Sequence, residues 1–166
     1  DYFFTSTTTT PASLTITNLD LTANYRLRLF GSRIQGSGPG DIRISRYIVT
    51  GVNGPFTNDL QTTGLGIGAG GYNGNNSNIV TVLGVVPNAS NQIQVQVLSV
   101  GSTTNAYLNV MEILANHSPV AVNDTFTRIA GNPITVADTQ LLANDTDSDG
   151  DALTLVGFGS LPAGAT

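Results

Sequence analysis

The chain has 166 residues, of which 40% are hydrophobic and only 10% are charged, and its net charge is −5. This apolar content excludes a chain that is disordered through high charge, and six basic residues against eleven acidic ones disfavour nucleic-acid binding. The absence of cysteine excludes disulfides, thiol catalysis and cysteine-ligated metal sites. No run of about 18 apolar residues is present, so no membrane-spanning helix is predicted.

Along residues 1–115, apolar and polar side chains alternate in several stretches, which predicts strands with one buried and one solvated face. In the clearest stretch Ile93, Val95 and Val97 face one way, and three glutamines face the other. Turn sequences rich in Gly, Pro and Asn separate the stretches. We therefore predict an all-β fold, a jelly roll or β-sandwich, with residues 1–11 as an N-terminal extension. In chain order, the predicted strands are residues 13–17, 25–30, 46–50, 79–83, 92–100 and 107–113.

The charge distribution changes at residue 116. Residues 1–115 hold five arginines against five acids, whereas residues 116–166 hold six aspartates against Arg128 alone. Residues 116–119, Asn-His-Ser-Pro, are typical of a short and stiff linker because proline restricts itself and the residue before it. Four short stretches beyond this linker are predicted strands, which are too few to close a sandwich. We therefore expect residues 120–166 to be an incomplete second β-domain of a longer protein. The four stretches are residues 120–122, 125–127, 133–136 and 153–156.

The stretch most suggestive of a binding site is residues 144–151, where carboxylates alternate along a tight loop that contains Gly150. Crowded hard oxygen ligands of this kind favour a cation such as Ca²⁺, and the glycine permits the turn. Counting from Asp145, the twelfth residue is Val156 rather than the glutamate of an EF-hand, so an EF-hand is excluded. The alternative is a solvated acidic turn that precedes a strand.

Residues 116–166 resemble the start of a bacterial cadherin-like tandem repeat of surface adhesins and exported enzymes. The similarity is carried by residues 116–124, 133–136 and 141–154. It implies an Ig- or cadherin-like β-sandwich at the cell surface, in which Ca²⁺ stiffens a string of adjacent domains of one chain. Residues 130–132 depart from the pattern because similar repeats usually carry an acid there, so one ligand is missing. The ligands that the resemblance implies are Asp124, Asp145, Asp147, Asp149 and Asp151.

Residues 12–115 resemble a jelly-roll module found near the C-terminus of many exported bacterial proteins and similar to carbohydrate-binding domains. Residues 19–33, 46–51, 87–90 and 106–113 carry this similarity, which implies non-catalytic sugar binding.

Sugar sites usually combine aromatic rings, which stack on apolar sugar faces, with amide and guanidinium donors. Phe56 and Tyr72 are candidate ligand-binding residues because they lie in loop-like surroundings, whereas the tyrosines in strand patterns are predicted to pack in the core. Arg43 and Arg46 are further candidates because guanidinium groups bind carboxylates and anionic polysaccharides. The alternative for both arginines is a solvent-facing strand position with an acid nearby.

We predict a non-catalytic adhesion or binding segment of a large extracellular bacterial surface protein. Catalysis is not predicted because the single histidine, His117, lies in the linker and the acids of the first segment are scattered. One alternative is a structural stalk or filament subunit that contacts neighbouring protein domains, with residues 2–7 adding as a strand to a neighbour's sheet edge. A second alternative is an accessory module of a secreted polysaccharide-degrading enzyme.

Overall fold

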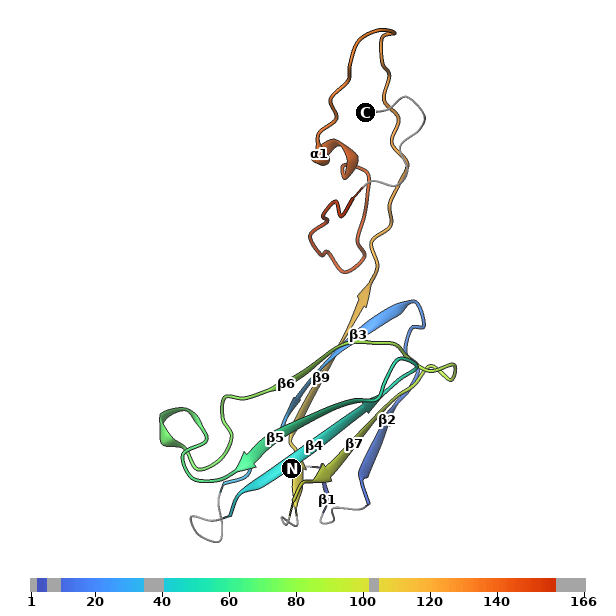
Figure 1. Cartoon of the computed structure of the whole chain (residues 1–166). Coiled ribbons are helices and arrows are strands. Elements are labelled where there is room, and N and C mark those ends of the chain that lie inside the picture. The colour runs from blue at the N-terminus through green and yellow to red at the C-terminus, as the bar shows by residue number, and fades with distance from the viewer. Residues whose placement is uncertain (1–2, 6–9, 35–40, 102–104, 158–166) are drawn as a thin grey trace. The chain divides into compact units, whose positions relative to one another are not determined.

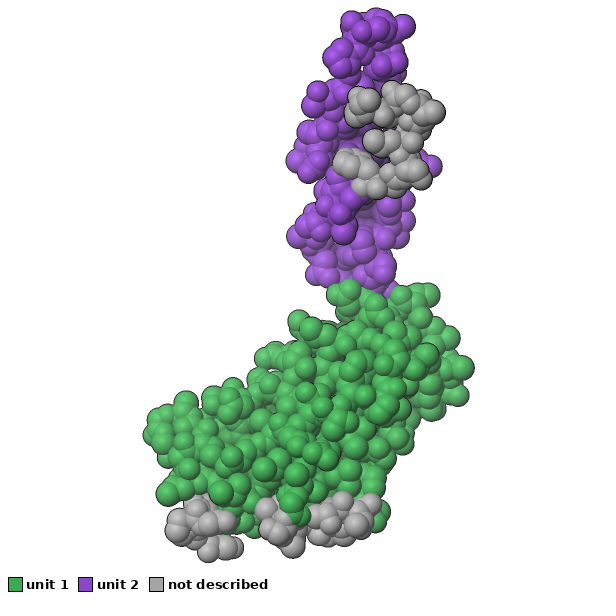
Figure 2. Space-filling model, in the orientation of Figure 1, with its two compact units in different colours: residues 1–116 green, residues 117–166 purple. Residues whose placement is uncertain are grey.

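The computed structural model describes residues 3–5, 10–34, 41–101 and 105–157. The chain divides into two compact units, Asp1–Asn116 and His117–Thr166, which Figure 2 shows in different colours. The division falls at the start of the predicted linker, residues 116–119. We refer to the two parts as unit 1 and unit 2.

Unit 1 is built from strands, as its alternating sequence predicts (Figure 1). In β3, for example, inward-facing Tyr25, Leu27 and Leu29 are buried while the residues between them are exposed. The all-β fold class is confirmed. The strands are β1 (Phe3–Thr5), β2 (Ala12–Ile16), β3 (Ala23–Phe30), β4 (Arg43–Thr50), β5 (Phe56–Thr63), β6 (Val80–Val85), β7 (Ile93–Ser99), β8 (Ala106–Leu108) and β9 (Val110–His117), with a single 3₁₀ turn, η1 (Ala69–Gly71), in the described residues.

The strands form two packed sheets. One sheet has the order β2-β7-β4-β5, and the other strands pair as β6-β3-β9 and β1-β8. Only Asn109 separates β8 from β9, and its N–H donates to the carbonyl of Phe30 at 2.8 Å. We therefore treat β8 and β9 as one strand. It pairs with β1 through β8 and with β3 through β9, which gives the order β1-β8/β9-β3-β6. These two four-stranded orders are those of a jelly roll.

The core lies between the two sheets. The alternation predicted for residues 92–100 is confirmed in β7, where Ile93, Val95 and Val97 are completely buried. Burying an apolar side chain of this size contributes about 1.5–3 kcal/mol, so the sandwich is held mainly by such contacts. The three tyrosines of the strand patterns are buried as predicted; they are Tyr25, Tyr47 and Tyr107.

Unit 2 holds one helical turn, α1 (Asp138–Leu141), and one bridge, between Val120 and Thr146, in its described residues. The prediction of four strands is wrong here, because none of those stretches forms a ladder. An isolated pair of strands is only marginally stable unless its apolar face packs against another element. The apolar side chains of these stretches are instead largely exposed, with Phe126 at 40% and Val156 at 97%.

Candidate binding site of unit 1 and the acidic loop of unit 2

The Gly-rich segment after β5, residues 64–78, folds into a lobe that asparagine side chains hold in place. Asn75 is 1% exposed, and its Nδ2 donates to the carbonyls of Gly31 at 3.0 Å and Asn78 at 2.7 Å. Its Oδ1 accepts the N–H of Asn78 at 2.8 Å. Asn76 binds both backbone groups of Ala69 within the lobe. Asn75 thus ties the base of the lobe to the end of the sandwich.

Tyr72 lies on this lobe against two glycines. A Cβ atom on Gly68 would come within 2.8 Å of the Tyr72 Cβ, and one on Gly74 would come within 3.1 Å of its Cε1. Glycine at both positions therefore lets the tyrosine approach the lobe backbone. Because 38% of Tyr72 remains exposed, the lobe presents an aromatic surface to solvent.

Two arginines lie at Tyr107, a residue of β8. Arg33 follows the end of β3, and Arg43 begins β4. The Cζ atoms of Arg33 and Arg43 each lie 5.7 Å from the centroid of the Tyr107 ring, which is a cation–π distance. Arg43 also donates to the Tyr107 hydroxyl and makes a bidentate pair with Asp41 at 2.8 and 2.9 Å. The hydrogen bond from Asp41 raises the pKa of Arg43. We call this group the Tyr107 cluster; it comprises Arg33, Asp41, Arg43 and Tyr107.

Hydrogen bonds fix the Tyr107 backbone on both sides. The Tyr47 hydroxyl donates to the Tyr107 carbonyl at 2.6 Å, and the Tyr107 N–H donates to Ser45 Oγ at 2.7 Å. Burial raises the pKa of Tyr47, so its hydroxyl stays protonated and remains a donor. A Cβ on Gly31 would lie 2.3 Å from both the Tyr107 carbonyl oxygen and the Tyr47 hydroxyl oxygen. The absence of a side chain at residue 31 is therefore required for this contact.

The four ligand-binding candidates of the sequence lie in different places. Tyr72 is exposed on the lobe, and Arg43 belongs to the Tyr107 cluster. Phe56 begins β5 opposite Val49 and packs against the core, at the opposite end of β5 from Thr63, the partner of Arg43.

Arg46 lies along β4 and forms a bidentate pair with Asp59 at 2.7 and 2.8 Å, which lowers the pKa of that carboxyl. Sequence reasoning overlooked Arg33 as a candidate because its stretch has no strand period and no acidic neighbour in the sequence. The signal that would have found it is an arginine that follows a predicted strand after a Gly-Ser pair, here Gly31 and Ser32 beyond the end of β3.

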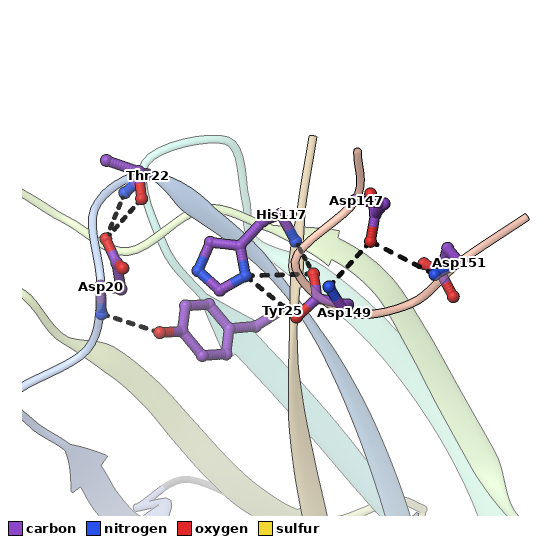
Figure 3. Close-up of polar contacts among 7 residues, drawn as sticks. All are labelled: Asp20, Thr22, Tyr25, His117, Asp147, Asp149 and Asp151. Atoms are coloured by element: carbon purple, nitrogen blue, oxygen red, sulfur yellow. Dashed lines mark hydrogen bonds and ion pairs between the residues drawn. The ribbon is translucent and has the colours of Figure 1, made fainter. Parts of the chain in front are cut away.

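In unit 2 the acidic loop uses its carboxylates as acceptors for backbone N–H groups (Figure 3). Asp147 Oδ1 accepts the N–H of Asp149 at 2.8 Å and that of Asp151 at 3.3 Å. Asp145 Oδ1 accepts the N–H of Val122 at 2.8 Å. These bonds shape the loop and hold the beginning of unit 2 against it.

His117 makes the most extensive contact with this loop. Its backbone N–H donates to Asp149, and its ring Nδ1 lies 3.0 Å from both carboxylate oxygens of that residue. The backbone hydrogen bond is the larger cause that lowers the pKa of Asp149. Figure 3 shows the imidazole directed at this carboxylate.

The predicted calcium ligands fit Ca²⁺ in kind, because all are hard oxygen donors. In the part of the chain that the structure describes, however, no three His, Asp or Glu side chains gather closely enough to hold a metal ion. Asp124 makes no hydrogen bond or ion pair within that part, and Asp145 and Asp149 are engaged as described above. Calcium binding therefore stays a prediction.

Residues 116–166 match the family model of the bacterial Ig domain. Domains of this kind are non-catalytic modules that commonly occur in surface proteins. This match is broader than the cadherin-like repeat that the sequence resembles. No curated protein and no solved structure matches the chain. None of the helices among the described residues has the length and apolar character needed to cross a membrane. Fold and match together define an all-β sandwich followed by a bacterial Ig-like segment.

Proposed function

We propose that this chain is a non-catalytic binding segment of an extracellular bacterial surface protein, in which unit 1 binds carbohydrate and unit 2 is a cadherin-like spacer. The observation that carries the proposal is the match of residues 116–166 to the bacterial Ig domain. Modules of this type are non-catalytic and common in surface proteins, and we assign the binding activity to unit 1.

Tyr72 supports carbohydrate as the ligand of unit 1. An aromatic ring with one free face stacks on the apolar face of a sugar, and Tyr72 keeps 38% of its surface exposed on the lobe. Its position against Gly68 and Gly74 restricts the ring before binding, which lowers the entropy cost of stacking. Residues 64–79 carry no charged side chain, as suits a surface that binds hydroxyl groups.

A glycan array probed with the full chain tests this proposal. We expect binding to a glycan class, and we expect Tyr72→Ala to weaken it about three- to tenfold, which corresponds to about 0.5–1.5 kcal/mol for one stacking contact. Leu83→Ala is the matched control, because Leu83 is 65% exposed on β6 and lies outside the lobe. Binding that Tyr72→Ala leaves intact, or no binding to any glycan, would contradict the proposal.

A structural stalk or filament subunit is the second candidate, and the edge of β9 favours it. Among the described strands, β9 pairs with β3 on one side only, and β1 covers β8 rather than β9. A strand edge of this kind presents unpaired N–H and C=O groups to another chain. Val110 and Leu114 are also exposed on β9, at 59% and 42%.

Sedimentation velocity over a range of concentrations separates the two candidates. A stalk subunit assembles through β9, and Leu114→Lys prevents this because a charge at an edge discourages strand pairing. A chain that stays monomeric while it binds glycan excludes the stalk. An accessory module of a polysaccharide-degrading enzyme would show the same glycan binding, with the enzyme as a neighbouring domain.

We further propose that Ca²⁺ binds the acidic loop and stiffens unit 2. The alternating aspartates supply the hard oxygens that Ca²⁺ prefers, and Asp151 offers a carboxylate with no side-chain hydrogen bond in the described residues. Calorimetric titration of the full chain with CaCl₂ should give binding heat and a raised melting temperature. The double variant Asp147→Asn, Asp151→Asn should lose both, whereas Asp138→Asn in α1 should keep them. No heat with the unmodified chain would refute this proposal.

A further inference from the structure

The chain contains two Asn-Gly pairs, Asn53-Gly54 and Asn73-Gly74. Asparagine is chemically labile, because the backbone nitrogen of the next residue can attack the carbon of its side-chain amide. A following glycine permits this attack most readily, since it has no side chain and adopts the widest range of backbone conformations. The two pairs have the same residue types, so their surroundings decide which asparagine reacts.

The side chain of Asn53 is held by both polar atoms of its amide. Its Nδ2 donates to the carbonyl of Gly84 at 2.7 Å, and its Oδ1 accepts the N–H of Val86 at 2.9 Å. The turn is fixed to the same segment, because the Val52 N–H donates to the Val86 carbonyl at 2.9 Å. Turning the amide carbon of Asn53 toward the Gly54 nitrogen would break both side-chain hydrogen bonds.

Asn73 is held less firmly, on the lobe that Figure 1 shows as a green loop between β5 and β6. In the part of the chain that the structure describes, its side chain makes one hydrogen bond, in which Oδ1 accepts the Gly66 N–H at 3.3 Å. Its Nδ2, the group that leaves in the reaction, has no partner there, and neither has the Gly74 N–H. Six of residues 64–74 are glycine, which leaves the backbone around the pair several accessible conformations.

Exposure and hydrogen bonding favour different asparagines. Exposure alone would favour Asn53, which is exposed, over Asn73, which is half-buried and precedes a buried glycine. The two hydrogen bonds of Asn53, however, lower the population of its reactive conformation roughly tenfold or more. Asn73 is open enough for water to reach it and has only one long bond to lose. We therefore expect the hydrogen bonds to decide the outcome.

We propose that Asn73-Gly74 is a site of spontaneous deamidation, which reacts ahead of Asn53-Gly54 in the folded chain. The Gly74 nitrogen bonds to Cγ of Asn73, the Cγ–Nδ2 bond breaks, and the proton of the Gly74 N–H leaves with Nδ2 as ammonia. The product is a five-membered succinimide, which water opens. Breaking the new N–Cγ bond gives aspartate, whereas breaking the original peptide bond gives isoaspartate, whose backbone runs through Cβ and Cγ.

Both products change the lobe, whatever ligand unit 1 binds. Residues 64–79 carry no charged side chain, so a carboxylate at residue 73 introduces a negative charge beside Tyr72. Isoaspartate also lengthens the backbone by one atom, two residues before Asn75. Because Asn75 ties the lobe to the sandwich, the modification loosens this attachment as the protein ages.

Peptide mapping of the full chain during incubation in mildly alkaline buffer tests this inference. Chymotrypsin cleaves after Phe56 and Leu60 and so places the two pairs in separate peptides, and mass spectrometry detects the replacement of NH₂ by OH. We expect Asn73 to deamidate at least about tenfold faster than Asn53. Hydroxylamine, which cleaves succinimides, should divide the aged, folded chain between residues 73 and 74. Asn73→Ser should abolish this cleavage.

The unfolded chain is the matched control, because urea removes the hydrogen bonds and leaves both Asn-Gly pairs in place. In urea the two asparagines should react at similar rates. Equal rates in the folded chain, faster reaction at Asn53, or no reaction at Asn73 would overturn the inference. A tenfold preference for Asn73 that persists in urea would overturn it too, since the preference would then come from the neighbouring sequence rather than from the fold.

Discussion

Replacing Asn75 by alanine should release the lobe from the sandwich and destabilise unit 1. The side chain makes three well-formed hydrogen bonds, at 3.0, 2.7 and 2.8 Å, to the backbone of Gly31 and Asn78. At about 1 kcal/mol each, their loss costs about 3 kcal/mol in the free energy of unfolding. The cost rises further if the Gly31 carbonyl is left buried without a donor. Asn73→Ala is the control, because Asn73 makes one long bond of 3.3 Å at the surface.

Urea unfolding followed by tyrosine fluorescence measures this difference in unit 1 alone. All five tyrosines lie within residues 1–116, and the chain has no tryptophan. The control variant should stay within about 0.5 kcal/mol of the unmodified chain. If Asn75→Ala cost less than about 1 kcal/mol with an unchanged urea dependence, the lobe would not depend on Asn75 and the argument would fail.

Three further predictions concern the sandwich. Gly31→Ala should cost more than about 3 kcal/mol or prevent folding, because its Cβ would lie 2.3 Å from the Tyr107 carbonyl oxygen; a melting curve close to that of the unmodified chain would contradict this. Tyr47→Phe should cost about 1–2 kcal/mol in urea unfolding, since it leaves that buried carbonyl without its donor, and an unchanged midpoint would show that the bond contributes nothing. Arg46 lowers the pKa of Asp59 below its ordinary 3.8, so the pair stabilises the fold above that pH and loses its effect as the pH falls through the lowered pKa. Because the pair is exposed, Asp59→Asn should cost only about 0.2–1 kcal/mol at neutral pH and nothing in strong acid; a difference that persists there would refute the ion-pair explanation.

The strands of unit 1 were predictable because their burial is periodic. Ile93, Val95 and Val97 lie on one face and the glutamines on the other in both sequence and structure. The tyrosines of β3 and β4 were predictable as core residues for the same reason. The alternation of apolar and polar residues shows which face of a strand is buried. It can be read from a few consecutive residues, without knowledge of distant parts of the chain.

The candidate site was predictable only in part, because its residues meet through contacts that sequence spacing does not encode. Tyr72, Arg43 and Phe56 were all chosen as candidates by residue type, and Phe56 packs against the core. Asn75 gave no signal, since one asparagine among several in a Gly-rich run does not reveal which is buried. In unit 2, apolar stretches were interpreted as strands although a ladder also needs a partner strand and a shared apolar face.

The ladder between β1 and β8 determines how unit 1 responds to mechanical force. Phe3 pairs with Leu108 and Thr5 with Ala106, so the start of β1 lies where β8 continues into β9. A pull on the two ends of unit 1 therefore loads this ladder first and separates its residue pairs one after another. The longer ladders of β3, β4 and β7 are loaded only after this ladder has separated. We expect the first extension under load to be the peeling of three residue pairs, after which both large sheets still resist the force.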